Sequence, residues 1–314
     1  MSKVTVIGAG NVGSTVANVL AHRDFLNEIV VLDIKEGTAE GKSLDTWQQA
    51  PIDSYSTRVV GCTNDYARTA DSDVVVITSG LPRKPGMSRD DLISVNAGIV
   101  KSVTEQVIKY SPKAIIIVVS NPLDVMTYCA YLTAKVDSSR VFGMAGILDT
   151  ARYRAFLATE LNCSPKDIQA ILMGGHGDTM VPLPRYTTVS GIPVTELISE
   201  EKLNAIVQRT KVGGGEIVNL LGTSAWYAPG AAAAQMVEAI IKNENRIFPV
   251  CALLNGEYGL KDIYLGVPVK LGKNGIEQII ELQLNEAEKA LLNASATAVK
   301  EVMEVLDKMN AASA

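Results

Sequence analysis

A histidine, a carboxylate and an arginine stand where they could take part in one reaction. His176 is one of only two histidines in the chain, and it lies among glycines in "GGHGDTMVP", directly after an apolar run. Asp149 and Arg152 follow a glycine-marked turn in "GMAGILDTARYRAF", at the start of a predicted helix. Histidine takes or gives a proton near neutral pH, and a neighbouring carboxylate can orient its ring. The sequence therefore predicts one titrating base, one orienting carboxylate and a fixed cation.

More cations gather in residues 80–91, "GLPRKPGMSRDD". Arg83, Lys84 and Arg89 lie within seven positions in a chain whose net charge is -5. The glycines and prolines between them suit a loop that moves as a unit. A solvated charged loop is the alternative, and we assign Lys84 to solvent. The other histidine, His22, is expected on a helix surface.

These residues need a scaffold, and the first half of the chain predicts one. Short β-branched runs alternate with helix-length segments: "KVTVIG", "EIVVLD", "TRVVG", "DVVVIT" and "AIIIVVS". Such near-continuous apolar strands indicate a parallel sheet covered by helices on both faces, an α/β doubly wound fold. Ligands bind at the carboxyl ends of such strands. The loop after "DVVVIT" and Asn121 in "SNPLDVMTY" both follow predicted strands at that edge.

The first strand leads into a glycine-rich turn. "VTVIGAGNVGSTVANVL" holds Gly8, Gly10 and Gly13 between a strand and a helical pattern, and Asp33 ends the second strand. Glycines allow a dinucleotide's pyrophosphate to approach the helix N-terminus, and the carboxylate can accept both ribose hydroxyls while repelling a 2'-phosphate. We predict an NAD site, with NAD favoured over NADP.

Composition narrows the setting. The 314 residues are 47% hydrophobic and 20% charged, as in a soluble globular chain of about two domains. The acidic balance argues against nucleic acid or an anionic membrane as a partner, and no apolar run is long enough to span a bilayer. Four scattered cysteines without a CxxC pair fit reduced thiols in a cytoplasmic protein and predict no metal site.

Other segments are expected to form scaffold. "SEEKLNAIVQRT" begins a helix that Gly213 to Gly215 should bend or break. "AWYAPGAAAAQMVEAII" could pack closely, inside the domain or across an interface. "GTSAWYAPG" could close a pocket floor with Thr223 and Ser224, or could be only a helix-entry turn. A C-terminal amphipathic helix, either core or subunit contact, is marked by Leu292, Ala296, Val299, Met303 and Leu306.

The chain resembles the lactate/malate dehydrogenase family from end to end. The motifs that carry the resemblance are "IGAGNVG", "GLPRKPGMSRDDL", "VSNPLDVMTY", "GMAGILDTARYRAF", "GGHGDTMVPL" and "GVPVKLGKNGIE". Within the family it is similar to malate dehydrogenases of the lactate-dehydrogenase-like type. The resemblance implies an N-terminal Rossmann domain (residues 1–143), a C-terminal α+β substrate domain (residues 144–314), a homodimer or homotetramer, and a tricarboxylic acid cycle enzyme. It also implies reversible oxidation of (S)-malate to oxaloacetate with NAD as cofactor.

The resemblance assigns a role to each candidate residue. His176 takes the hydroxyl proton, Asp149 orients its ring, and Arg152 binds the carboxylate beside the reacting carbon. Arg89 polarises the carbonyl oxygen, and Arg83 pairs with the second carboxylate, where lactate-specific relatives typically have glutamine. A monocarboxylate would leave Arg83 unpaired, which costs roughly 3 to 5 kcal/mol. Asn121 orients the substrate, and the expected cofactor contacts are Gly8, Ala9, Gly10, Asn11, Val12, Gly13, Asp33, Asn96, Val119, Ser120 and Asn121.

Alternatives remain open at this point. A lactate dehydrogenase or another 2-hydroxy-acid dehydrogenase is disfavoured by Arg83. An NAD-dependent glycosidase would need a metal, and no cysteine lies beside His176. A non-catalytic NAD-binding module would not need His176, Asp149, Arg152 and the loop arginines together.

Overall fold

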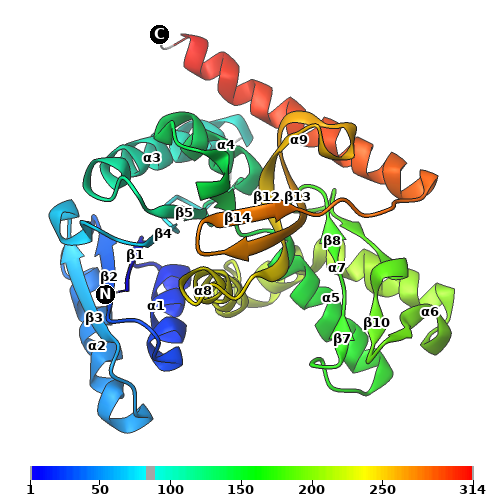
Figure 1. Ribbon diagram of the computed structural model, residues 1–314, viewed down its shortest axis with the longest axis horizontal. Helices are drawn as coiled ribbons and strands as arrows, with labels where there is room; N and C mark the ends of the chain where they lie inside the picture. Colours follow the sequence, from blue (N-terminus) through cyan, green and yellow to red (C-terminus); the bar gives the residue numbers. More distant parts are fainter. Residues whose placement is uncertain (1, 83–88, 313–314) are drawn as a thin grey trace.

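The computed structural model of the chain describes residues 2–82 and 89–312. Its first half forms six parallel strands in the order β3-β2-β1-β4-β5-β6 (Figure 1). Their bounds are β1 Lys3–Ile7, β2 Glu28–Asp33, β3 Arg58–Thr63, β4 Val74–Ile77, β5 Ile115–Val118 and β6 Val141–Gly143. Strands β4 and β5 are buried along their whole length, as the apolar runs predicted. The doubly wound parallel sheet is confirmed.

Helices cover both faces of these strands (Figure 1). Helices α3 (Arg89–Tyr110) and α4 (Leu123–Ala134) pack against each other on one side. Helices α1 (Asn11–Arg23) and α2 (Thr38–Asp53) lie on the other side, where α1 also packs against α8 (Tyr227–Ile241). The sheet core is therefore closed to solvent on both faces, and its strand ends are left to form sites.

The second half extends the same sheet with antiparallel strands. Strands β12 (Arg246–Asn255), β13 (Lys261–Gly272) and β14 (Gly275–Ile279) give nine strands in all, and Cys251 of β12 pairs with Gly143 of β6. The sheet thus runs across the predicted boundary between residues 143 and 144, which stays a prediction. The remaining elements are α5 Gly146–Leu161, β7 Ile168–Gln169, β8 Leu172–Met173, β9 Val181–Pro182, β10 Thr188–Val189, β11 Ile192–Pro193, α6 Val194–Leu197, α7 Glu200–Leu221 and α9 Glu286–Ala312, with 3-10 turns at Tyr66–Thr69, Ser138–Arg140, Pro184–Tyr186 and Glu257–Gly259.

The sequence predicts that glycines bend or break the helix after residue 200; the break does not occur, and the bend stays a prediction. Helix α7 runs without interruption through Gly213, Gly214 and Gly215. Each glycine costs about 1 kcal/mol in a helix interior, but none prevents its hydrogen bonds. A Cβ on Gly213 would lie 3.5 Å from Cδ of Arg152 and 3.7 Å from Phe156, which is ordinary van der Waals contact, so α7 packs against α5 at this position.

Two segments that could have been subunit contacts lie in the core instead. The apolar residues of α9 named above are all buried within the chain. In α8, a Cβ on Gly230 would lie 2.5 Å from Cγ2 of Thr15, so the small-residue helix packs tightly against α1. No helix within residues 2–82 and 89–312 has the length and apolarity needed to cross a bilayer.

Candidate active site

The site lies at the carboxyl ends of the parallel strands. Strands β1 and β4 are neighbours in the sheet but not in the chain, so their following loops diverge and leave a crevice between them. The β1 strand leads into the glycine turn, and β5 leads into Val119 and Asn121. The sequence prediction had placed the cofactor loop and Asn121 at this edge, and the structure brings both there.

The three glycines of the turn are required for different reasons. Gly8 has a φ of +105°, which side chains rarely adopt. A Cβ on Gly13 would lie 1.9 Å from the carbonyl oxygen of Gly8, so α1 can start this close to the turn only with glycine there. A Cβ on Gly10 would meet nothing within 4 Å, so the space beside Gly10 is open.

This turn fits a dinucleotide's pyrophosphate. Gly10 is the N-cap of α1, no side chain caps the helix, and no acidic residue lies in its first turn. The first N–H groups and the positive end of the helix dipole therefore face the open space beside Gly10. Asp33 accepts hydrogen bonds from the backbone N–H groups of Ala9 (2.6 Å) and Lys35 (2.9 Å), which holds its carboxylate beside the turn.

Asn96 and Ser120 are both buried. Asn96 is 1% exposed; its amide nitrogen donates to the carbonyls of Leu81 (3.1 Å) and Asn121 (2.7 Å), and its Oδ1 accepts from Leu81 N–H. Ser120 donates from Oγ to the carbonyl of Ser79 at 2.5 Å. Both residues join the loops after β4 and β5. A direct contact of either with the cofactor stays a prediction.

His176, Asp149 and Arg152 form one hydrogen-bonded group. Nδ1 of His176 lies 2.8 Å from Oδ2 of Asp149, and Nη1 of Arg152 donates to Oδ1 of the same carboxylate at 3.1 Å. The Asp149 side chain is only 2% exposed. Asp149 and Arg152 are one turn apart on α5, so the helix itself sets their spacing.

Two opposing effects set the pKa of His176. Burial and the charge of Arg152 lower it, while the charge and hydrogen bond of Asp149, together with the charge of Asp124, raise it. The net effect raises the pKa above its ordinary value of 6.5. Proton affinity at this ring is therefore strengthened by its carboxylate neighbours.

Asp124 is a residue that the sequence reasoning missed, although it lies in the quoted segment "SNPLDVMTY". Its Oδ2 accepts a hydrogen bond from the backbone N–H of His176 at 3.0 Å, and the residue is 8% exposed. Burial raises the pKa of Asp124, and the hydrogen bond from His176 opposes that rise. The signal available was that Asp124 is the only charged residue of that segment.

A cavity of about 310 Å³ joins these residues to the cofactor turn. It is lined by Val12, Val119, Asn121, Leu123, Met144, Leu148, Arg152, His176, Gly177, Met180, Lys211, Gly214, Gly215, Val218, Ser224, Ala225 and Pro229. Ser224 lines it as expected, whereas Thr223 is not among these residues. Nε of Arg152 is buried and has no hydrogen-bond partner in the described residues. An anion in the cavity would supply one.

Two predicted residues cannot be placed. Arg83 lies outside the described residues, and so does the Arg89 side chain, although Arg89 begins α3. No cluster of three potential metal-ligating side chains occurs in the described parts of the chain.

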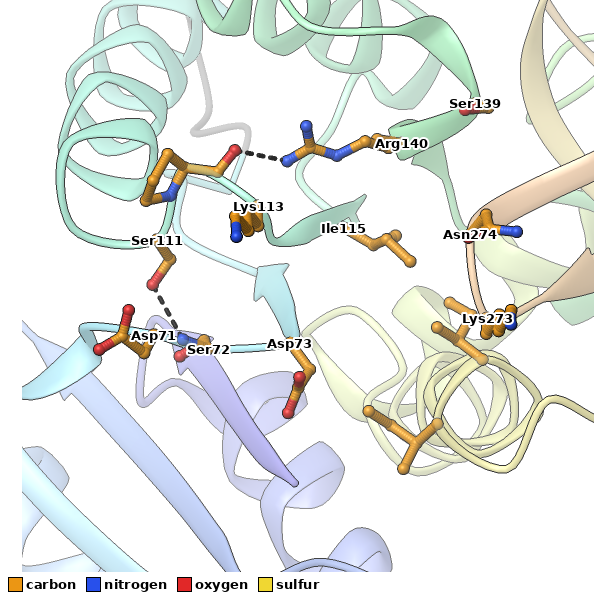
Figure 2. A pocket seen from close by; sticks show the side chains of 13 residues that line it. Asp71, Ser72, Asp73, Ser111, Lys113, Ile115, Ser139, Arg140, Lys273 and Asn274 are labelled. Atoms are coloured by element: carbon orange, nitrogen blue, oxygen red, sulfur yellow. Dashed lines mark hydrogen bonds between the residues drawn. The ribbon is translucent and has the colours of Figure 1, made fainter. Parts of the chain in front are cut away.

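A second cavity, of about 580 Å³, lies at the opposite edge, where β4, β5 and β6 begin (Figure 2). Arg140 donates from Nη2 to the carbonyls of Pro112 (2.6 Å) and Ala114 (2.8 Å), and Ser111 accepts from the Ser72 N–H at 3.1 Å. Neither histidine lines this cavity. It lacks the titrating base that the cavity beside His176 contains.

Comparison with known proteins agrees with this geometry. Residues 2–143 match the model of the lactate/malate dehydrogenase NAD binding domain, and residues 147–309 match that of the family's alpha/beta C-terminal domain. A malate dehydrogenase of Cytophaga hutchinsonii is 72% identical over 97% of this chain and 98% of its own.

Solved structures are similar as well. The malate dehydrogenase of Salinibacter ruber has a TM-score of 0.95 at 56% identity, covering 99% of this chain and 100% of that one. A lactate dehydrogenase of Cryptosporidium parvum complexed with lactic acid and nicotinamide adenine dinucleotide has a TM-score of 0.93 at 38% identity, with 98% of each chain covered. Both family models and these full-length similarities show that the chain belongs to the lactate/malate dehydrogenase family of NAD-dependent oxidoreductases.

Proposed function

We propose that the protein is an NAD-dependent malate dehydrogenase that interconverts (S)-malate and oxaloacetate. The observation that carries the proposal is the group of His176, Asp149 and Arg152 beside one cavity that also reaches the cofactor turn. NAD, when bound, accepts or returns the hydride. All other steps are derived from the chain's own residues.

His176 is the proton acceptor in malate oxidation and the donor in oxaloacetate reduction. Asp149 is bound to Nδ1, so Nε2 is the ring nitrogen left for the substrate's oxygen. Asp149 fixes this tautomer and stabilises the charged ring once the proton has moved. Asp124 keeps the backbone of His176 in place from a second direction.

Arg152 binds the carboxylate next to the reacting carbon. Its guanidinium is held at Nη1 by Asp149, and its Nε has no partner in the described residues, so a carboxylate can satisfy buried donors that the fold leaves free. A planar arginine fork can do this in a fixed orientation, which lysine cannot reproduce. Orientation of the substrate carbon toward the cofactor follows from this contact and from Asn121.

Discrimination between malate and lactate is the finer part of the proposal. Following the family resemblance, Arg89 polarises the carbonyl oxygen and Arg83 pairs with the second carboxylate. A malate dehydrogenase and a lactate dehydrogenase share this fold at TM-scores of 0.95 and 0.93, so the substrate preference depends on side chains and not on the fold.

We also propose a cellular compartment and a pathway for the enzyme. Reduced cysteines suit a cytoplasmic enzyme, and all four cysteines are free. Conversion of malate to oxaloacetate would place it in the tricarboxylic acid cycle.

We propose a homo-oligomer, either a dimer or a tetramer, because α2 leaves Leu44 (58%), Trp47 (40%) and Ile52 (79%) exposed. Light scattering tests this, and a monomer at micromolar concentration would contradict it. We also propose that the chain divides into two domains between residues 143 and 144.

The deciding experiment compares kcat/KM for NADH oxidation with oxaloacetate and with pyruvate. We expect a preference for oxaloacetate of roughly a hundredfold or more, because an unpaired Arg83 penalises a monocarboxylate. Arg83→Gln should reduce that preference. Comparable rates with the two substrates would contradict the malate assignment, and activity with neither would support a non-catalytic NAD-binding module.

A further inference from the structure

One face of α7 forms a wall of the cavity beside His176. Lys211, Gly214, Gly215 and Val218 all line the cavity. Their spacing of three, one and three residues places them on a single stripe of the helix. Because this stripe belongs to an unbroken helix, its position is set by the scaffold.

Lys211 is the cation on this stripe. Its side chain is partly buried, and no hydrogen bond or ion pair joins its ammonium to another residue in the ranges 2–82 and 89–312. Arg209, two positions earlier, differs. Its Nη2 and Nε donate to Glu216 at 2.7 and 3.0 Å, and its guanidinium stacks over the ring of Phe156. Arg209 is therefore paired and Lys211 is not.

Lys211 and Arg152 contribute to the same cavity from different helices. A Cβ on Gly214 would lie 3.8 Å from both terminal nitrogens of Arg152, and Lys211 is one helical turn from Gly214. Gly214 and Gly215 place no side chain between the two cations. A small ligand that contacts both cations would lie against these two glycines.

The ionisable side chains that line this cavity are all basic. Arg152, His176 and Lys211 are its ionisable lining residues, and no acidic side chain lines it in the described parts of the chain. Asp149 already balances part of the charge of Arg152 from behind. Arg152 has donors left for one carboxylate, and Lys211 is the lining cation without a partner in the described residues, so a second carboxylate on the ligand would pair with it.

We propose that Lys211 determines specificity by binding the substrate carboxylate that is remote from the reacting carbon. This inference rests on the proposed function. It adds to the loop residue Arg83 a second, helix-borne cation for the same carboxylate. Lys211 therefore favours four-carbon dicarboxylates over monocarboxylates of the same length, and it does so through binding because it does not touch the reacting atoms.

The test replaces Lys211 with methionine, which keeps the length of the side chain and removes its charge. We measure kcat, KM and kcat/KM for oxaloacetate and for 2-oxobutyrate, which has a methyl group in place of the remote carboxylate. For Lys211→Met, kcat/KM for oxaloacetate should fall roughly tenfold to a hundredfold, mainly through KM, the usual effect of losing one charge-assisted contact. The value for 2-oxobutyrate should be unchanged or higher, and Lys211→Arg should restore most of the preference.

Lys202→Met is the matched control. Lys202 is on the same helix, outside the cavity, and pairs with Glu160 on the surface, so its replacement should leave the substrate ratio unchanged. Lys211→Gln serves as a second neutral variant, and thermal unfolding checks that each variant is folded. Equal losses for both substrates, no loss for oxaloacetate, or a change confined to the KM for NADH would each overturn the role of Lys211. A wild-type enzyme that does not prefer oxaloacetate would instead overturn the proposed function.

Discussion

Nδ1 of His176 lies 2.8 Å from Oδ2 of Asp149, and the same carboxylate holds Arg152 through its other oxygen. An ionised carboxylate only accepts hydrogen bonds, so the proton between them belongs to the imidazole. One buried aspartate thus fixes both the tautomer of the base and the position of the substrate-binding arginine.

Asp149→Asn should lower kcat/KM for oxaloacetate by roughly two to four powers of ten, as when a general acid is deprived of its orienting group. The substitution removes a charge that raises the pKa of His176, so that pKa should fall. In reduction, which needs the protonated ring, activity should then be lost at a lower pH than in the wild type. A pH profile of kcat/KM measures this. An unchanged profile would show that Asp149 does not control the ring.

Stability should depend on pH through the same ring. The pKa of His176 in the folded protein lies above its ordinary value of 6.5, so the folded state holds this proton more tightly than the unfolded state. The stabilisation is fully present below pH 6.5 and is lost as pH rises through the folded-state pKa. Urea unfolding of the wild type and of His176→Gln over this range isolates the contribution. Parallel curves for the two proteins would contradict it.

Arg152→Lys should raise the KM for oxaloacetate and lower kcat/KM by roughly a hundredfold or more, because an ammonium cannot replace a forked pair of donors. The partial charge balance with Asp149 survives, so loss of fold is not expected. Steady-state kinetics and a thermal scan together separate the two effects. A lysine variant with near wild-type kcat/KM would remove Arg152 from the substrate site.

Gly10→Ala and Gly13→Ala form a matched pair. A Cβ at Gly13 would collide with the carbonyl of Gly8 at 1.9 Å, so this variant should lose about 1 to 3 kcal/mol of unfolding free energy. A Cβ at Gly10 meets nothing in the protein and enters the space left for the pyrophosphate. Gly10→Ala should therefore keep its Tm and bind NADH more weakly. Fluorescence titration with NADH measures the second effect, and unimpaired binding would place the pyrophosphate elsewhere.

Asp33→Ser should shift cofactor preference toward NADPH. The carboxylate beside the turn repels a 2'-phosphate and accepts ribose hydroxyls, so its removal should raise the KM for NADH and lower that for NADPH. The ratio of kcat/KM for the two cofactors is the measurement. A variant that still excludes NADPH would assign this discrimination to another residue.

The sequence predicted those features that follow from strand ends and periodicity. Apolar runs such as "DVVVIT" are expected as strands of a parallel sheet covered on both faces, and residues that follow such strands lie at one edge of the sheet. His176 and Asp149 are 27 positions apart, however, so the sequence predicts the pair only from residue types after glycine-marked turns, and the family resemblance supplies the role of each. Asp124 was missed because its partner is a backbone N–H, which carries no signal in the sequence.

At the glycines of α7 the sequence predicts a break that the structure does not have. Local propensity predicts a break at Gly213, but α7 continues through it and packs against α5, despite a cost of about 1 kcal/mol per glycine. Two of these three glycines, Gly214 and Gly215, line the cavity and add no side chain to it. Such a compensation between tertiary contacts and local preference is visible only in three dimensions.

The pairing of Cys251 with Gly143 makes the two halves of this protein poor modules for exchange. A Cβ on Gly143 would lie 3.1 Å from Cβ of Cys251 and 2.5 Å from Oγ1 of Thr127, so the seam tolerates little change in side-chain volume. A chimera that joins this cofactor-binding half to the substrate half of a relative has to carry both sides of that seam from one parent. The constraint on exchanging halves lies at the contact between β6 and β12, in the middle of the sheet, more than in the residues that join β6 to α5.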